Sequence, residues 1–318
     1  MESQNVIESQ NGSSQSTGIN YEHKEAESFK SKVTRYAMWA LRVKKGSQML
    51  DRVKNGGASI YEHPIPPKGF GKKYNLTSWQ VEGRDVTSIA PKENKAKKHI
   101  LFLHGGAYVF NSSKLHWNLV ERLVNVTNCT VIAPDYPLAP SQTYIDTYRF
   151  MEQIYNKLAS EVDPSDIIFM GDSAGGGLAL GLAQKLKQDG LPQPGHIILL
   201  APWLDVTCSN PEINDIEKED VLLNAEHLKL AGQAYAKGGD ISSYLVCPIN
   251  GSVEGLGKIS VFIGTYDILY ADVKKFKTMC DEKGVAINYF VYPKMIHDWL
   301  IFGLAESERA IQQIKALI

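Results

Sequence analysis

The serine in the segment Gly171-Asp172-Ser173-Ala174-Gly175 is the strongest candidate for a reactive group in this sequence. An apolar run at 166–170 precedes it, and helix-forming residues follow it. A Gly-x-Ser-x-Gly segment between a buried strand and a helix places the serine on a sharp turn and exposes its hydroxyl above the sheet. Glycine is expected at both flanks because Cβ atoms there would collide across so tight a turn. The pattern predicts that Ser173 is a nucleophile.

A second glycine-rich segment, His104-Gly105-Gly106-Ala107, follows the apolar run at 99–103. Glycines let the backbone approach a bound carbonyl group and direct N–H groups at its oxygen. This is half of an oxyanion hole, and the N–H after the nucleophile supplies the other half. The expected donors are Gly105, Gly106, Ala107 and Ala174. Which two of the first three contribute stays open, and we expect His104 to brace the loop.

A serine nucleophile needs a general base, and His297 is the best-placed histidine. It follows the apolar run at 287–292 and so lies near the carboxyl end of a strand, where reactive groups of open α/β sheets collect. His227, in a long interval without a strand, is a weaker alternative. We expect activity to fall as the pH drops through the ordinary pKa of histidine, about 6.5.

Two aspartates compete for the role of orienting acid, because Asp267 and Asp205 both follow apolar runs of strand length. Asp267 is favoured because it lies after the serine and one strand before His297. Asp272 is expected to cap a helix instead. The order Ser173, Asp267, His297 is the nucleophile–acid–base order of α/β-hydrolases.

These groups need a framework, and the sequence predicts one in which strands and helices alternate. Continuous apolar runs are typical of strands buried on both faces, and runs of strand length lie at 99–103, 130–134, 166–170, 196–200, 258–263 and 287–292. Helical patterns lie between or after them, at 115–126, 143–160, 178–188, 272–283 and 304–318. The alternation predicts a mostly parallel central sheet flanked by helices.

Three further segments do not follow this alternation of strands and helices. Residues 74–89 predict an antiparallel pair of strands that opens the sheet. Residues 206–244, helical around 226–236, are expected to form an insertion above it. Between 25 and 50, apolar residues recur at spacings of three and four, which predicts an amphipathic helix. That helix either packs on the core or forms a lid.

Taken together, several motifs resemble the signatures of the hormone-sensitive-lipase-like esterases. They are His104-Gly105-Gly106-Ala107, Asp135-Tyr136-Pro137-Leu138-Ala139-Pro140, Gly171-Asp172-Ser173-Ala174-Gly175-Gly176, Pro202-Trp203-Leu204-Asp205 and Tyr266-Asp267-Ile268-Leu269. The resemblance spans about 99–299 and implies an α/β-hydrolase fold under a helical cap, acting on carboxylic esters without a cofactor. It also implies Ser173, Asp267 and His297 as catalytic residues. Ala107 and Pro137 depart from the pattern, which has glycine and arginine there.

The predicted organisation has four parts. Residues 1–20 are expected to be a disordered tail, since they lack the apolar residues to offset chain entropy. Residues 21–58 are expected to form N-terminal cap helices, and 205–244 a cap insertion. The α/β-hydrolase core is expected at 59–204 and 245–318.

Composition excludes several other classes. Thirty-four basic and 35 acidic side chains leave a net charge of −1, which gives no electrostatic reason to bind nucleic acid. No apolar stretch is long enough for stable membrane insertion. The four cysteines are widely spaced, which favours free thiols and a cytoplasmic location. No cluster suggests a metal site, and the sequence is compatible with a homodimer.

The predicted activity is a serine carboxylesterase for short- to medium-chain esters, with Trp39 and Trp203 as pocket walls or ordinary core aromatics. An amidase or peptidase with the same three residues is an alternative, as is a non-enzymatic ligand-binding protein on this scaffold. A dinucleotide-binding protein is disfavoured, because the glycines at 175, 177 and 181 lie within the helix that Ser173 opens.

Overall fold

A single mixed sheet organises the chain. The computed structural model describes residues 18–41, 43–45, 48–56, 62–93 and 97–318, so most of the predicted tail, residues 1–17, lies outside the described residues. The nine strands stand in the spatial order β1-β9-β8-β7-β6-β4-β5-β3-β2. Their bounds are β1 Asn20–Glu22, β2 Asn75–Val81, β3 Arg84–Ala90, β4 His99–Leu103, β5 Thr130–Pro134, β6 Ile167–Asp172, β7 His196–Leu200, β8 Lys258–Tyr266 and β9 Ile287–Ile296.

Strand β3 runs antiparallel to both of its neighbours, β2 and β5, and the other described pairs are parallel. This confirms the predicted mostly parallel sheet and the antiparallel pair that opens it. Because the strands from β4 to β9 run the same way, their carboxyl ends meet along one edge of the sheet. Polar residues placed just after those ends come together there.

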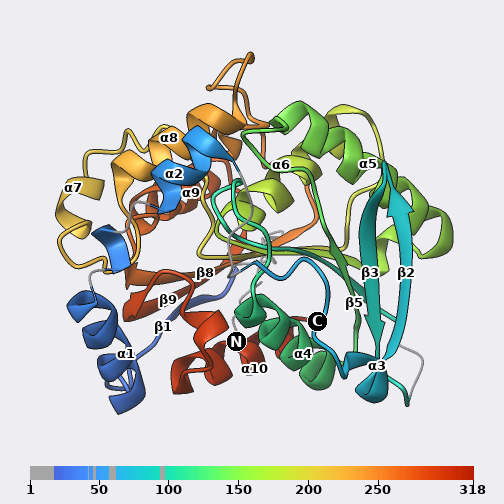
Figure 1. The fold of residues 1–318 in the computed structure, drawn as a ribbon, viewed down its shortest axis with the longest axis horizontal. Coiled ribbons are helices and arrows are strands. Elements are labelled where there is room, and N and C mark those ends of the chain that lie inside the picture. The colour runs from blue at the N-terminus through green and yellow to red at the C-terminus, as the bar shows by residue number, and fades with distance from the viewer. Residues whose placement is uncertain (1–17, 42, 46–47, 57–61, 94–96) are drawn as a thin grey trace, which may run out of the picture.

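Helices cover both faces of this sheet (Figure 1). Helices α4 and α10 pack on one face, and α5, α6 and α9 pack on the other. The helix bounds are α1 Phe29–Ala40, α2 Gln48–Asn55, α3 Phe70–Lys73, α4 Lys114–Thr127, α5 Tyr144–Glu161, α6 Ala174–Gln188, α7 Ile213–Ile216, α8 Ala225–Tyr235, α9 Tyr270–Glu282 and α10 Ala305–Leu317. Short 3-10 turns lie at Val43–Lys45, Pro164–Asp166, Pro248–Asn250 and Trp299–Phe302.

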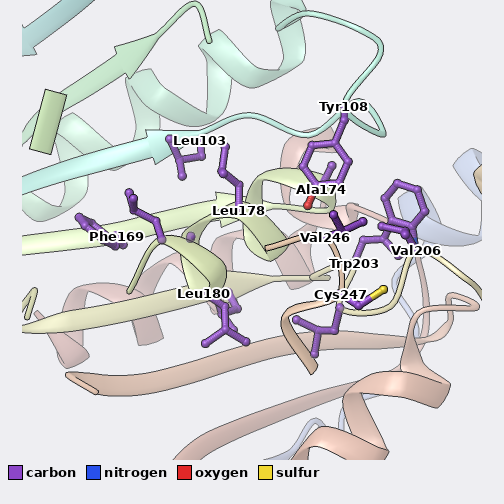
Figure 2. Close-up of a cluster of buried hydrophobic side chains, with 14 of the residues drawn as sticks. Leu103, Tyr108, Phe169, Ala174, Leu178, Leu180, Trp203, Val206, Val246 and Cys247 are labelled. Carbon is purple, nitrogen blue, oxygen red and sulfur yellow. The ribbon is translucent and has the colours of Figure 1, made fainter. Parts of the chain in front are cut away.

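The central strands are buried on both faces, as their continuous apolar runs predict. In β4, Leu101 and Leu103 face the α6 side, whereas Ile100 and Phe102 face the α4 side. Successive side chains of a strand point to opposite faces, so a strand covered twice must be apolar throughout. Figure 2 shows part of the α6-side core, where Leu103 and Phe169 of the sheet gather with Leu178 of α6.

The N-terminal region differs from its predicted form. Strand β1 begins at Asn20, inside the predicted tail, and pairs in parallel with β9. The tail prediction therefore extended too far, because the open edge of β9 accepts three residues that carry little apolar character. The helix expected within 25–50 is also divided, since α1 ends at Ala40 and α2 begins at Gln48. Among the residues described, no helix has both the length and the apolar character to cross a bilayer.

Candidate active site

Ser173 lies on a sharp turn between β6 and α6. Its backbone has φ 53° and ψ −121°, a strained conformation for a residue other than glycine. Its N–H donates to the carbonyl of Leu200 at 2.9 Å, and its carbonyl accepts from Trp203 N–H at 2.9 Å. These bonds to the segment after β7 hold the turn in place and leave the Ser173 hydroxyl at the carboxyl edge of the sheet.

The glycines that flank Ser173 are required for two different contacts. A Cβ on Gly171 would lie 2.3 Å from the carbonyl oxygen of Gly175, which is the collision across the turn that the sequence predicts. A Cβ on Gly175 would instead lie 2.0 Å from the carbonyl oxygen of Leu103 in β4. Gly175 therefore permits the close approach of α6 to the neighbouring strand.

The structure brings Ser173, His297 and Asp267 into one hydrogen-bonded chain. The Ser173 Oγ lies 2.9 Å from His297 Nε2, and His297 Nδ1 lies 2.8 Å from Asp267 Oδ2. The other carboxylate oxygen of Asp267 accepts from Leu269 N–H at 2.9 Å. All three side chains are buried. In this arrangement Nδ1–H donates to the carboxylate, which leaves Nε2 free to accept the Ser173 proton.

A second carboxylate meets the same imidazole. Asp298 Oδ2 lies 3.1 Å from His297 Nε2, the nitrogen that also faces Ser173. Burial disfavours the imidazolium, but the negative charges of Asp267 and Asp298 outweigh it and raise the pKa of His297 well above its ordinary value. The expectation of an unperturbed base near 6.5 is therefore wrong. Burial raises the pKa of Asp298 itself to about 6.

Asp220 is a third buried carboxylate at the site, and sequence reasoning missed it. Its Oδ2 accepts from Ile268 N–H at 3.0 Å, next to Asp267. Its Oδ1 accepts from the N–H groups of Leu222 and Leu223, each at 2.8 Å. Burial, together with the charge of Asp267, raises the pKa of Asp220 to about 6. Asp220 thus ties the 205–244 segment to the turn that carries Asp267.

The competing acids occupy other positions. Asp205 accepts from the N–H and the hydroxyl of Thr207 at 2.8 and 2.6 Å, which closes a local turn. Asp272 lies in the first turn of α9, where it accepts from Asn210 Nδ2 at 3.0 Å. It is not the cap of that helix, as the sequence had suggested, because Leu269 occupies the N-cap position. The alternative base His227 lies in the first turn of α8.

The glycine-rich loop after β4 lies beside Ser173. Gly106 has φ 123°, and a Cβ there would lie 2.4 Å from Phe110 O. Ala107 has φ 52°, so this alanine adopts a left-handed conformation that favours glycine. Gly105 packs against Asp172, the residue before Ser173, since a Cβ at position 105 would lie 2.4 Å from Asp172 Oδ2. The loop is therefore held close to the turn that carries Ser173.

His104 braces this loop, as predicted. Its Nδ1 lies 2.7 Å from Gly105 O, and its ring stacks on Tyr136 with centroids 4.3 Å apart. The hydroxyl of Tyr136 donates to His104 O at 2.6 Å. Burial lowers the pKa of His104 to about 4, so the ring is neutral at physiological pH. The adjacent Pro137 uses its carbonyl to accept from the Thr147 hydroxyl at 2.9 Å.

Of the two tryptophans considered as pocket walls, Trp203 is fully buried and stacks with Tyr108, so it is a core aromatic. Trp39 is exposed and borders a hollow of about 560 Å³, together with Lys44 and Val221. Within the described ranges, no group of three or more His, Cys, Asp or Glu side chains could hold a metal ion.

Comparison with known proteins gives the same class as the geometry. A family model for the alpha/beta hydrolase fold matches residues 100–301, and the chain therefore belongs to the α/β-hydrolase family. An esterase of Acinetobacter venetianus is 31% identical over 239 residues, which cover 74% of this chain and 77% of the relative. An acetyl-hydrolase of Streptomyces hygroscopicus is 27% identical, over 69% of this chain and 74% of the relative.

Comparison with solved structures gives the same class of protein. An esterase from the bacterial hormone-sensitive lipase family superposes with a TM-score of 0.80 at 25% identity, covering 92% of this chain and 98% of the other. The predicted resemblance to that group is confirmed, and the chain is a carboxylic ester hydrolase of this kind.

Proposed function

We propose that the chain hydrolyses carboxylic esters through an acyl-enzyme formed on Ser173. The observation that carries the proposal is the chain of hydrogen bonds from Ser173 Oγ through the His297 imidazole to Asp267. His297 Nε2 takes the proton of the hydroxyl as its oxygen attacks the ester carbonyl carbon. Asp267 holds the tautomer with the proton on Nδ1 and stabilises the imidazolium that forms.

The remaining steps use the same groups. To complete acylation, His297 returns its proton to the leaving alcohol when the ester C–O bond breaks, and the acyl group remains on Ser173. A water molecule then attacks the acyl carbon while His297 Nε2 takes its proton. The carboxylic acid departs as Ser173 Oγ regains a proton, so the cycle closes without a cofactor.

The negative oxygen of each tetrahedral intermediate needs N–H donors, each typically contributing about 3–4 kcal/mol. We assign the role to the N–H of Ala174 and to two of the N–H groups of Gly105, Gly106 and Ala107, in the loop that packs beside Ser173. Ala107 retains its N–H, although the family pattern has glycine at this position.

The proposed substrates are esters with short to medium acyl chains. The names of two relatives support this class, since one is an acetyl-hydrolase and another, from Pseudomonas putida, is an ethyl acetate hydrolase. Rates on p-nitrophenyl esters from acetyl to palmitoyl test it. We expect kcat/KM to be highest between the acetyl and octanoyl esters and to fall steeply beyond them. A maximum at palmitoyl would contradict the short-chain assignment.

An amidase or peptidase reaction is not favoured by the relatives, which are named as ester hydrolases. Parallel assays on p-nitrophenyl acetate and p-nitroacetanilide separate ester hydrolysis from amide hydrolysis. Turnover of the anilide at a rate comparable to that of the ester would favour the amidase.

The proposed location is a reducing one such as the cytoplasm. It fits the four cysteines, which are all buried and free.

A further inference from the structure

Helix α1 exposes its apolar face to solvent. Phe29, Val33, Tyr36 and Ala40 recur at spacings of four and three, so they lie on one face of the helix. We define the α1 apolar face as five exposed large side chains on and beside this surface, with exposed fractions of Phe29 81%, Val33 49%, Tyr36 67%, Trp39 63% and Leu41 77%. Single exposed apolar residues are ordinary, but a contiguous group of this kind marks an interaction surface.

The helix is held in this orientation by its polar side. The buried carboxylate of Glu306 accepts from Ser28 N–H at 2.7 Å and from the hydroxyls of Ser28 and Ser31 at 2.9 and 2.6 Å. Arg35 and Met38 lie on the same inward side as Ser31. Figure 1 shows α1 at the margin of the molecule, beside β1. Both predicted roles for the amphipathic pattern required its apolar face to be covered, and the described residues leave it uncovered.

The segment that carries the α1 apolar face is basic in sequence, although Lys44 pairs with Glu217 at 3.8 Å. Residues 28–47 contain six basic side chains and no acidic one. Lys30 and Lys32 lie on either side of the α1 apolar face, and both are exposed. Among nearby acidic residues, Glu27 pairs with Arg35 at 2.9 Å, so its charge is compensated. An apolar strip flanked by lysines is typical of helices that lie in the interface of a bilayer with anionic lipids.

We propose that α1 docks this hydrolase on an anionic lipid surface, with the α1 apolar face buried at the acyl boundary and the lysines at the headgroups. The helix would lie on the membrane without crossing it. This goes beyond the hydrolytic reaction, because it concerns where the protein meets its esters. The hollow bordered by Trp39 and Ala40 opens beside the docked helix.

Two other occupants fit the surface less well. A second copy of the chain would bring two sets of Lys30 and Lys32 together, and like charges oppose that contact. The segment 1–17 carries only Met1, Val6 and Ile7 as large apolar residues, too few to cover five side chains. An anionic lipid surface satisfies both the apolar strip and the positive charge.

Co-sedimentation with vesicles tests the proposal directly. The full chain is mixed with vesicles of phosphatidylcholine alone, or of phosphatidylcholine with about 30% phosphatidylglycerol at low salt. We expect binding to the anionic vesicles that weakens as salt is added. The double variant Phe29→Ser with Tyr36→Ser should lose at least about tenfold in partition coefficient. Lys32→Gln should lose about fivefold, which corresponds to about 1 kcal/mol per basic residue near such a surface.

Matched controls distinguish vesicle binding through the α1 apolar face from nonspecific binding through other exposed side chains. Ile65→Ser with Ile145→Ser removes two other exposed apolar side chains, and Lys237→Gln removes another exposed charge. Both control variants should bind like the wild type. Ser173→Ala should also bind normally, so a failure of the proposed reaction would not be mistaken for a failure of docking.

Several results would overturn the proposal. One is that the wild type does not bind anionic vesicles. A second is that the α1 variants and the control variants lose vesicle binding equally. A third is that the wild type binds no vesicles and forms a dimer in sedimentation velocity, which Phe29→Ser with Tyr36→Ser converts to monomer. That last result would assign the α1 apolar face to self-association.

Discussion

At the scale of single residues, two carboxylates act on opposite nitrogens of the His297 imidazole. Asp267 meets Nδ1 and favours the tautomer that activates Ser173. Asp298 meets Nε2, where a carboxylate favours a bound proton and so competes with Ser173 for that nitrogen. Asp298 therefore makes the resting base harder to deprotonate.

This competition predicts the effect of Asp298→Asn on the pH profile. Neutral His297 is the active form, so activity is lost as the pH falls through its raised pKa, above the ordinary 6.5. Removing the Asp298 charge lowers that pKa, and the acid limb of kcat/KM should move to lower pH. Asparagine tolerates the left-handed backbone of this position, φ 52°, so the fold should persist. A limb that stays in place or moves to higher pH would refute the role given to Asp298.

Asp267→Asn should have a different and larger effect. The amide keeps the shape of the side chain but favours the wrong imidazole tautomer, which in serine proteases costs about four orders of magnitude in kcat. We expect a loss of at least about a hundredfold in kcat, measured on purified folded protein. Asp205→Asn is the matched control and should cost much less, because Asp205 closes a local turn. Reversed magnitudes would reassign the acid.

The sequence could predict Ser173, His297 and Asp267 because each follows a strand of a parallel sheet, and all such strand ends meet at one edge. Asp298 could have been noticed as an acidic neighbour of the base. Its contact with Nε2, however, depends on a left-handed backbone turn that no local pattern specifies. Asp220 lies 47 residues before Asp267, and only the folded path of the 205–244 segment brings them together.

At the scale of elements, the approach of α6 to β4 positions Ser173 against the glycine-rich loop. A methyl group at position 175 would meet the backbone of β4, which cannot move aside as a side chain does. Gly175→Ala should therefore lower the free energy of unfolding by about 1–3 kcal/mol or more and sharply reduce kcat. Chemical denaturation and steady-state kinetics measure the two effects.

Gly71→Ala is the control for that substitution, since its Cβ would make only an ordinary 3.7 Å contact with Leu76. It should be neutral or stabilising by up to about 1 kcal/mol. If Gly175→Ala behaved like Gly71→Ala, the close approach of α6 to β4 would not constrain the site.

The strands of the core were predictable because burial on both faces leaves a continuous apolar run, and β4, β5 and β7 begin and end where the sequence indicates. Strand β1 was not predictable. Its three residues carry no periodic apolar signal, and their pairing depends on the open edge of β9. The division between α1 and α2 was hidden because the apolar spacing continues past Ala40.

At the scale of the whole molecule, the sheet, the buried site and the outward face of α1 have different physical origins. The core and the site follow from strand burial and from the shared edge of parallel strands. The exposed strip on α1 is set by polar contacts to α10 through Glu306, which sequence periodicity cannot reveal. Periodicity shows that a helix has an apolar face but does not show what covers it.

The central claim is that Ser173 forms the covalent intermediate, and labelling with a fluorophosphonate tests it most directly. The reagent is attacked by an activated serine, so intact-protein and peptide mass spectrometry should find one adduct per chain, on the peptide that contains Ser173. Folded Ser173→Ala should remain unlabelled under the same conditions. Equal labelling of Ser173→Ala, or an adduct on another residue of the wild type, would contradict the claim.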